Sequence, residues 1–373
     1  MKAFLILEDG SIFNGQSIGS TKDAICEIVF NTSMTGYLEA LTDPSYVGQG
    51  MVMTYPLIGN YGTNSDDAES DRAWVSAFII RELAKRPSNF RNRESLADYL
   101  IRNEITGIQR VDTRALTRIL REKGTMNGMV TCNEDYTWGE GLKTALTKIK
   151  NHSFTSQVAA VSGNKRVYNT IEQLRPGKNI LTPPNKYKIA AIDLGIKKNM
   201  IEMLLKRGCE VTCFNYKVTA EEILEGGFDG ILLSNGPGDP SNCMETVETT
   251  KKLIKSNIPI FGICLGHQVI ALAAGGSSVK MKYGHRGENH PVKDLESGRV
   301  YISAQNHGYV IKDDGFDPNE VKISHINVND KTVEGIKFLH KKIFSVQYHP
   351  EACGGPRDSE YLFDEFIEMV GGN

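Results

Sequence analysis

The 373-residue sequence lacks any long apolar run. Its longest apolar stretches, such as IPIFGICLG, are far shorter than the roughly 20 residues that a membrane-spanning helix needs. Near the N-terminus, MKAFLILEDGSIF holds only a short apolar run before Glu8 and is neither rich in arginine nor poor in acidic residues. The sequence therefore predicts no membrane span, no secretory signal and no transit peptide.

The sequence also lacks a strong charge of either sign and lacks regular cysteine spacing. A formal net charge of −2 gives no electrostatic reason to expect binding to nucleic acid or to an acidic membrane. The seven cysteines are odd in number, irregularly spaced and without a C-x-x-C pair. This pattern argues against a disulfide framework and a structural zinc site, and a reducing cytoplasm is the expected location.

Two further kinds of motif are missing. The sequence contains no G-x-x-x-x-G-K-[ST] and no G-x-G-x-x-G after a strand, so we expect no nucleotide-phosphate site in this chain. His285, His290, His307 and Cys353 are conceivable metal ligands, but no H-x-x-x-H or C-x-x-C spacing supports them. We therefore expect neither a metal nor a cofactor in this chain.

What is present predicts two domains, because the chain is too long for one compact core. Segment 176–188, PGKNILTPPNKYK, holds three prolines and few apolar residues, which is typical of a linker. We predict domains at 1–175 and 188–373, with the linker at 176–187. The predicted fold class is α/β, with an N-terminal α+β domain followed by a doubly wound, mainly parallel sheet.

The second domain alternates short apolar strands with helices, which indicates βαβ units. From about residue 278 the pattern predicts antiparallel strands, with AQNHGY (304–309) in a turn between two of them, and then a closing helix. The secondary-structure pattern of the N-terminal half is less regular, and its strand topology is not predicted. It shows a hairpin with Asp-Gly at its turn and a helix, DTRALTRILREKG, capped by Asp112 or Thr113 and ended by Gly124.

The stretch FGICLGHQ (261–268) places Cys264 between two glycines, after a strand and before a helix. A G-x-nucleophile-x-G turn strains the backbone of the nucleophile, so the neighbouring side chains must be minimal. The helix N-terminus would favour the thiolate, and the N–H of Leu265 would face a developing oxyanion. A buried structural cysteine is the alternative.

A thiolate nucleophile needs a base, and the base needs a group that orients it. QYHPE (347–351) supplies His349 and Glu351 directly after a strand, and the proline between them stiffens the segment. A loop histidine is the alternative for His349 taken alone, but the cysteine turn and the His-Pro-Glu segment together favour a catalytic group. His267 and His307 are expected to pack rather than to catalyse.

Two more segments fit the same site. SNGPGDP (234–240) offers Gly236 and Gly238, where a backbone without Cβ atoms can approach a ligand closely. A simple tight turn explains these glycines equally well. AQNHGY offers Asn306 and Gly308 in the predicted turn.

FGICLGHQ, SNGPGDP and HPE together resemble the class I, triad-type glutamine amidotransferases over residues 188–373. FNTSMTGYLEALTDPSYVGQ, TYPLIGNYGTN and GIQRVDTRALTRILREKGTMNG resemble the N-terminal domain of the carbamoyl-phosphate synthetase small subunit. The resemblance therefore covers essentially the whole chain.

This resemblance implies that Cys264 attacks the side-chain amide of glutamine, that His349 relays the proton and that Glu351 orients His349. It also implies a set of positions that hold glutamine: Ser45, Gly236, Gly238, Leu265, Gln268, Asn306, Gly308 and Tyr309. Tyr309 and Cys353 depart from the family, which often has Phe and Ser there. The N-terminal domain would dock a large subunit in a heterodimer or higher oligomer, and that subunit would bind ATP and Mg²⁺.

The expected function is glutamine hydrolysis that delivers ammonia to a large, ATP-using subunit for carbamoyl phosphate synthesis, as part of a ligase. Two alternatives are an amidotransferase subunit of another synthetase, of the anthranilate or GMP type, and a non-catalytic regulatory subunit. The sequence leaves open whether the product serves arginine synthesis, pyrimidine synthesis or both.

Overall fold

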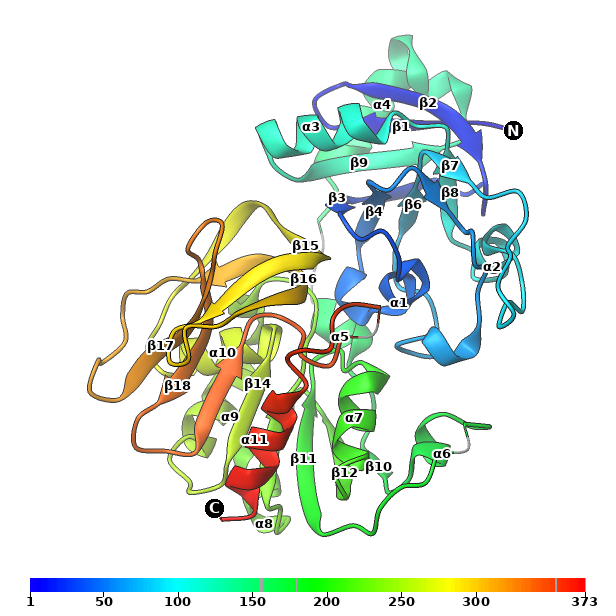
Figure 1. Cartoon of the computed structure of the whole chain (residues 1–373). Coiled ribbons are helices and arrows are strands. Elements are labelled where there is room, and N and C mark those ends of the chain that lie inside the picture. The colour runs from blue at the N-terminus through cyan, green and yellow to red at the C-terminus, as the bar shows by residue number, and fades with distance from the viewer. Residues whose placement is uncertain (154–156, 179, 353, 373) are drawn as a thin grey trace. The chain divides into compact units, whose positions relative to one another are not determined.

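The computed structural model describes residues 1–153, 157–178, 180–352 and 354–372. The chain forms two compact units, Met1–Thr155 and Ser156–Asn373, and each is described by itself (Figure 1). Within the described residues, no helix combines the length and the apolar character that crossing a membrane requires. The Cys353 departure noted above lies outside the described residues.

The N-terminal unit is built on a closed barrel in which the strand order is β1-β2-β8-β6-β4-β3-β9. The barrel strands are β1 (Lys2–Leu7), β2 (Ile12–Ser17), β3 (Ala24–Asn31), β4 (Gln49–Met53), β6 (Ala77–Ile79), β8 (Thr106–Gln109) and β9 (Met126–Thr131). A separate parallel pair joins β5 (Leu57–Ile58) and β7 (Glu82–Leu83). The helices are α1 (Tyr37–Thr42), α2 (Leu96–Arg102), α3 (Thr113–Lys123) and α4 (Gly139–Lys150), with 3₁₀ turns η1 (Pro44–Tyr46), η2 (Ser65–Asp67) and η3 (Glu134–Thr137).

Both local predictions for this unit are confirmed. Strands β1 and β2 pair antiparallel, and Gly10 between them has φ +87°, which favours glycine. Helix α3 begins after Asp112, whose side chain accepts a hydrogen bond from the N–H of Ala115 at 3.0 Å. The cap is therefore Asp112 and not Thr113.

The C-terminal unit contains a ten-stranded sheet in the order β10-β12-β11-β13-β14-β19-β18-β17-β15-β16. Its strands are β10 (Arg166–Tyr168), β11 (Tyr187–Asp193), β12 (Cys209–Asn215), β13 (Gly230–Leu233), β14 (Ile260–Ile263), β15 (Ser278–Asp294), β16 (Val300–Ile311), β17 (Val321–Asn327), β18 (Val333–Phe338) and β19 (Ile343–Val346). Strands β12, β11, β13, β14 and β19 run parallel. The predicted α/β class with a mainly parallel sheet is confirmed for this region.

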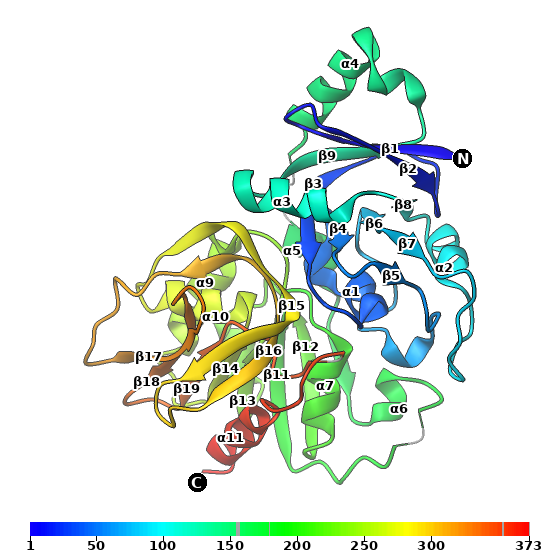
Figure 2. The same ribbon diagram turned by 45° about the horizontal axis from the view of Figure 1, so that its top comes forward.

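Helices cover both faces of the parallel strands (Figures 1 and 2). They are α5 (Gln157–Val161), α6 (Ile171–Leu174), α7 (Lys198–Leu205), α8 (Ala220–Glu225), α9 (Met244–Leu253), α10 (Leu265–Ala273) and α11 (Tyr361–Val370), with the 3₁₀ turn η4 (Pro240–Cys243). Helices α8, α9 and α10 pack in one apolar cluster with alternate sheet residues such as Ile260. Helices α6, α7 and α11 pack in a second cluster with the other set, such as Phe261. Because the strands are buried on both sides, they are almost continuously apolar.

Two predictions about the second unit differ from the structure. Residues 304–309 do not form the predicted turn. They lie inside β16, which pairs with the long strand β15. Gly308 lies at a register shift of the β15–β16 ladder, and Asn306 pairs directly with Arg286. Strand β19 pairs antiparallel with β18, as predicted, but also parallel with β14, which joins it to the central sheet.

The chain divides earlier than the linker predicted at 176–187. The segment before that linker packs on the C-terminal unit, because β10 pairs with β12 and the apolar residues of α6 join the cluster around α7. Arg175 is buried and donates from Nε to Glu202 of α7 at 2.7 Å. Prolines at 176–184 therefore lie inside this unit and do not separate the two units.

Candidate active site

Cys264 lies at the junction of β14 and α10, in the centre of the C-terminal sheet. Its backbone has φ 55° and ψ −105°, a conformation that a residue with a side chain rarely adopts. Such strain costs about 1–3 kcal/mol and persists only where the surroundings enforce it. The N–H of Cys264 donates to the carbonyl of Val346 on β19 at 2.9 Å, which holds the strained residue in place.

The two glycines around Cys264 are required by close packing. A Cβ atom on Gly266 would lie 2.2 Å from the carbonyl oxygen of Leu233, and one on Gly262 would lie 2.5 Å from the side chain of Ile270. The first neighbour is backbone and has little freedom to move. The glycines therefore let α10 start against β13 while the turn presents Cys264.

The start of α10 leaves a backbone donor free beside the sulfur. The N–H groups of Gly266 and Gln268 donate to the carbonyls of Ser234 and Cys264 at 3.0 and 3.2 Å. Among the described residues, the N–H of Leu265 donates to no acceptor, as is expected in the first turn of a helix. This donor and the positive end of the helix both favour a negative charge close to Cys264.

His349 and Glu351 follow β19 and form a buried pair. Nδ1 of His349 lies 2.8 Å from Oε1 of Glu351, and the two residues are 3% and 0% exposed. Because a carboxylate only accepts, the proton of this hydrogen bond lies on Nδ1. In the part of the chain that the structure describes, Nε2 makes no hydrogen bond, and Cys264 is among the groups that raise the pKa of the ring, so the sulfur lies beside His349.

Two residues that the sequence did not single out complete this group. The ammonium of Lys197 lies 2.5 Å from Oε1 of Glu351, and Lys197 is only 7% exposed. The side-chain amide of Asn199 donates to the backbone carbonyl of Glu351. Lys197 precedes α7 and Asn199 lies in its first turn, far from Glu351 in sequence. Lys197 follows β11 and Glu351 follows β19, and the parallel order β11-β13-β14-β19 places the ends of both strands at the same edge of the sheet.

The electrostatics of the buried group set two pKa values. Burial raises the pKa of Glu351, but Lys197 and His349 outweigh burial and lower it to about 2. Burial and the Lys197 ammonium lower the pKa of His349, but Glu351 and Cys264 outweigh both and raise it to about 9. At neutral pH the group therefore holds a carboxylate beside an imidazolium.

Lys197→Met should raise the pKa of both Glu351 and His349, because the ammonium disfavours a proton on each. If the imidazolium donates to the leaving group, kcat/KM falls as pH rises through the pKa of His349, near 9. In the variant this fall should occur at a higher pH. Breaking a buried ion pair should also lower the free energy of unfolding by about 3 kcal/mol. Lys255→Met, at an exposed lysine, is the control. An unchanged pH profile of kcat/KM would contradict this role.

The predicted Gly236 and Gln268 lie on segments that contact α10 or belong to it. A Cβ on Gly236 would lie 2.8 Å from the side chain of Leu265, so the Gly236 backbone packs against the residue that follows Cys264. Gly238 has φ +91°, which favours glycine. The side-chain amide of Gln268 donates to the backbone carbonyl of Tyr309 at 2.8 Å, which links α10 to β16.

Strand β16 reaches the same place. The thiol of Cys264 contacts the backbone carbonyl of Asn306 at 3.7 Å. A Cβ on Gly308, two residues on, would lie 3.3 Å from the guanidinium of Arg286, which leaves little room for a side chain. Seven of the eight predicted glutamine contacts thus lie on segments that meet at Cys264 in one unit. Ser45 lies in η1 of the other unit, where it is buried.

His267 packs, as predicted. Its Nδ1 lies 2.9 Å from the hydroxyl of Ser345, and complete burial lowers the pKa of the ring to about 3. A neutral ring on the inner face of α10 fits a structural role.

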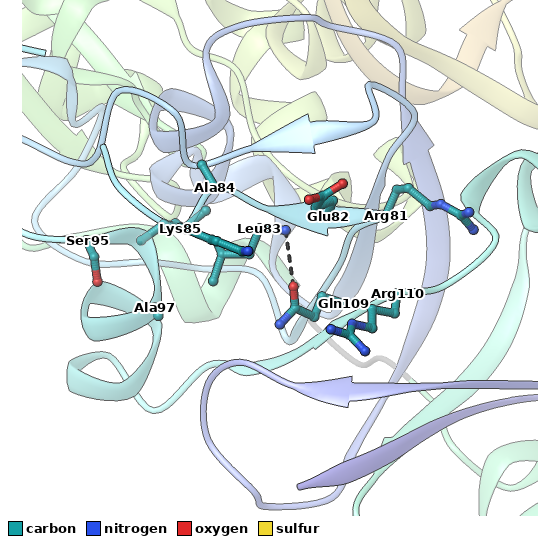
Figure 3. Close-up of a pocket in the computed structure, with 10 residues that line it drawn as sticks. Arg81, Glu82, Leu83, Ala84, Lys85, Ser95, Ala97, Gln109 and Arg110 are labelled. Carbon is teal, nitrogen blue, oxygen red and sulfur yellow. Dashed lines mark hydrogen bonds between the residues drawn. The ribbon is translucent and has the colours of Figure 1, made fainter. Parts of the chain in front are cut away.

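A cavity of about 560 Å³ lies in the N-terminal unit (Figure 3). Arg81, Lys85, Arg110 and Glu82 line it, and the N–H of Leu83 donates to the side chain of Gln109 at 3.2 Å. None of the predicted site residues lines this cavity.

Comparison with known proteins identifies the family of the chain. Residues 190–369 match the sequence model of the class-I glutamine amidotransferases, and residues 5–130 match that of the carbamoyl-phosphate synthase small chain, CPSase domain. A carbamoyl phosphate synthase small chain from Clostridium perfringens is 49% identical, and the alignment covers 99% of this chain and all of that protein. The chain belongs to the carbamoyl-phosphate synthase small-chain family.

Other members of the family are similarly close. The small chain from Caldanaerobacter subterraneus subsp. tengcongensis is 45% identical over 99% of this chain and 97% of its own length. The pyrimidine-specific small chain from Bacillus subtilis is 44% identical over 99% of this chain and 96% of its own length. Family membership thus extends over both units, as the sequence motifs predicted.

Proposed function

We propose that this chain is the glutamine-hydrolysing subunit of a carbamoyl-phosphate synthase and that Cys264, His349 and Glu351 carry the reaction. The observation that carries the proposal is the strained cysteine at the start of α10, beside an imidazole that a buried carboxylate orients. Such a set of nucleophile, base and orienting group is typical of acyl transfer. The small-chain names of relatives that match over nearly the whole chain support the same reaction.

The chemistry follows from the positions of these groups. The thiolate of Cys264 attacks the side-chain carbonyl carbon of glutamine, and the C–N bond breaks as the imidazolium of His349 gives a proton to the departing ammonia. The remaining γ-glutamyl thioester is then hydrolysed, with His349 as base for the attacking water. Glutamine and water are consumed, and glutamate and ammonia are released.

The oxyanion of each tetrahedral intermediate would be held by backbone donors. The free N–H of Leu265 is one of them, and the backbone N–H of Gly236, whose Cα packs against the Leu265 side chain, is proposed as the other. Removing one such donor in other hydrolases costs about 10²–10³ in kcat. Gly238, Gln268, Asn306, Gly308 and Tyr309 are proposed to bind the amino-acid end of glutamine, and the contribution of Ser45 stays a prediction.

The acceptor of the ammonia is proposed to be a separate large chain. The sequence shows no nucleotide-phosphate motif, whereas carbamoyl phosphate synthesis from bicarbonate consumes ATP. We propose that the N-terminal unit docks this ATP-using chain. Matches over 99% of the chain to named small chains favour this partner over an anthranilate-type or GMP-type synthetase.

Co-expression of the tagged full-length chain with the large synthase chain of the same organism tests the assignment. The two should co-purify, and the complex should form carbamoyl phosphate from glutamine, bicarbonate and ATP with one glutamate released per product. Capture of an anthranilate-type or GMP-type synthetase from the same cells, with no product from the large synthase chain, would support the alternative instead. If neither the chain alone nor its complex hydrolyses glutamine, the result would support the alternative of a non-catalytic regulatory subunit.

A further inference from the structure

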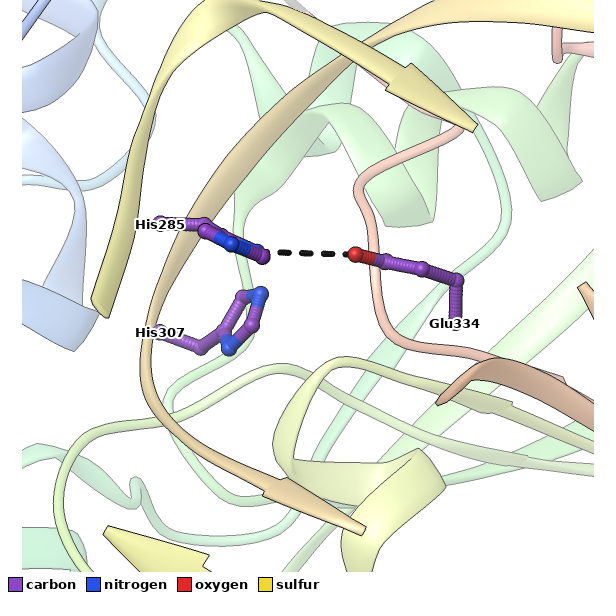
Figure 4. A group of neighbouring side chains, drawn as sticks. All are labelled: His285, His307 and Glu334. Atoms are coloured by element: carbon purple, nitrogen blue, oxygen red, sulfur yellow. Dashed lines mark ion pairs between the residues drawn. The ribbon is translucent and has the colours of Figure 1, made fainter. Parts of the chain in front are cut away.

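A second buried polar group lies on the antiparallel side of the C-terminal sheet. His285 of β15, His307 of β16 and Glu334 of β18 each offer a ligand atom, and these atoms lie within 4.8 Å of one another. The three residues, called here the His–Glu cluster, are 6%, 6% and 0% exposed. Figure 4 shows His285 and Glu334 pointing toward each other, with the ring of His307 beside them.

The hydrogen bonds of both rings determine which nitrogen carries the lone pair. Nε2 of His285 lies 2.8 Å from the carboxylate of Asp330, so this nitrogen donates and Nδ1 faces Glu334 at 3.5 Å. Nδ1 of His307 lies 2.8 Å from the carbonyl of Tyr309, so it donates and Nε2 holds the lone pair. The side-chain oxygen of Gln305 is placed 2.6 Å from that Nε2. Because an oxygen does not donate, a lone pair on Nε2 requires the Gln305 amide to be turned so that its NH₂ group donates there, and a metal ion would replace this contact.

Two atoms of the cluster lack partners although they are buried. Nδ1 of His285 and Oε2 of Glu334 make no hydrogen bond in the described part of the chain. Glu334 Oε1 is held by the side-chain amide of Asn327 at 3.1 Å. Buried polar atoms without partners cost about 1–3 kcal/mol each, so a missing ligand is the simplest explanation.

We propose that His285, His307 and Glu334 bind one transition-metal dication of the Zn²⁺ type. Two imidazole nitrogens and a carboxylate are a donor set that Zn²⁺ accepts, with a fourth position left for water or a further side chain. The outer hydrogen bonds to Asp330 and to the carbonyl of Tyr309 orient the two rings, as acceptors around metal-binding histidines generally do. The cluster is outside the catalytic group, and nothing proposed above uses it.

The surrounding charges favour a cation. Asp330 and Glu334 bring two carboxylates, which oppose the positive charge of the nearby Arg286 guanidinium. The ring of His290 lies 5.0 Å from that of His285, and its Nε2 also lacks a partner, so a further donor is close. A bound ion would join three strands, including the one that carries Asn306 beside Cys264. Its expected role is to stabilise this part of the sheet.

Zinc binding to the full-length chain tests the proposal. Cys264→Ala serves as the background, because the thiol is itself a zinc ligand. The metal-stripped protein is titrated with Zn²⁺ in competition with a chromogenic chelator, and its thermal unfolding is followed with and without the metal. We expect one Zn²⁺ per chain at micromolar or lower concentration, a higher Tm with Zn²⁺, and visible absorption typical of tetrahedral Co²⁺ when Co²⁺ replaces it.

Three variants identify the ligands. Glu334→Gln and His307→Gln should weaken Zn²⁺ binding at least tenfold, and Asp330→Asn, at a partly exposed residue, should weaken it about tenfold through the orientation of His285. His340→Gln, at an exposed histidine, is the control and should bind like the background. Circular dichroism checks that each variant is folded. If the substitutions at the buried residues Glu334 and His307 unfold the chain, Asp330→Asn still tests the site, because Asp330 is partly exposed.

Two outcomes would overturn the proposal. Absence of Zn²⁺ binding would mean that a proton occupies the metal position. Burial lowers the pKa of His285, but the carboxylates of Asp330 and Glu334 outweigh burial and raise it to about 9. Binding that all three variants retain would place the metal elsewhere on the chain.

Discussion

Cys264→Ser, in complex with the large chain, should lose carbamoyl phosphate synthesis from glutamine at least a thousandfold and keep synthesis from ammonium. The serine hydroxyl is far less acidic than a thiol, so the nucleophile is lost, although the helix N-terminus and the N–H of Leu265 remain. The ATP-dependent steps do not need the sulfur. One assay with two nitrogen sources therefore separates the two reactions.

Cys243→Ser is a matched control, because Cys243 is also buried and also precedes a helix, α9. Its φ is −108°, an ordinary value, so no strained turn presents its sulfur. Burial raises the pKa of the Cys243 thiol to about 12, which keeps it protonated and unreactive. This variant should use both nitrogen sources. Normal glutamine use by Cys264→Ser would show that Cys264 is structural.

His349→Gln should lower kcat/KM for glutamine by about 10²–10⁴, the usual contribution of a general acid–base group. Glutamine keeps a polar side chain of similar size but can neither take the thiol proton nor protonate the leaving ammonia. The loss should fall mainly on kcat, because His349 acts on the reacting atoms rather than on the amino-acid end of the substrate. Steady-state kinetics with glutamine as the nitrogen source give kcat and KM, and the same assay with ammonium in place of glutamine serves as the comparison.

The control for this variant is His340→Gln, at an exposed histidine that precedes β19 and lies outside the site. It should behave like the wild type with both nitrogen sources. A loss of ammonium-dependent synthesis in His349→Gln would indicate a disturbed fold or assembly. A loss confined to KM would contradict a proton-transfer role.

The catalytic part of the site could be predicted because its signals are local. Gly262 and Gly266 flank Cys264 in sequence, and the close packing that requires them is a property of one turn. His349 and Glu351 are two residues apart, so their contact also depends on local geometry. Short-range patterns of this kind can be recognised in the sequence, and the strand–turn–helix context then confirms them.

Other features depend on contacts that the sequence does not display. Lys197 reaches Glu351 across 154 positions of the chain, and nothing near either residue signals the pair. The N-terminal barrel closes through pairs such as β2 with β8 and β1 with β9, which are distant in sequence. Pairing with β15 similarly turned the predicted loop at 304–309 into a strand. Tertiary pairing decides such elements, and local propensity does not.

The central claim is that Cys264 forms a covalent bond to the γ-carbonyl carbon of glutamine. Mass spectrometry of the full-length chain, quenched in acid during turnover with glutamine, tests this claim most directly. We predict an adduct with the mass of glutamine less ammonia on the peptide that contains Cys264, labile to hydroxylamine as a thioester is, and absent from Cys264→Ser. Turnover without any adduct on that peptide, or an adduct on another cysteine, would contradict the account.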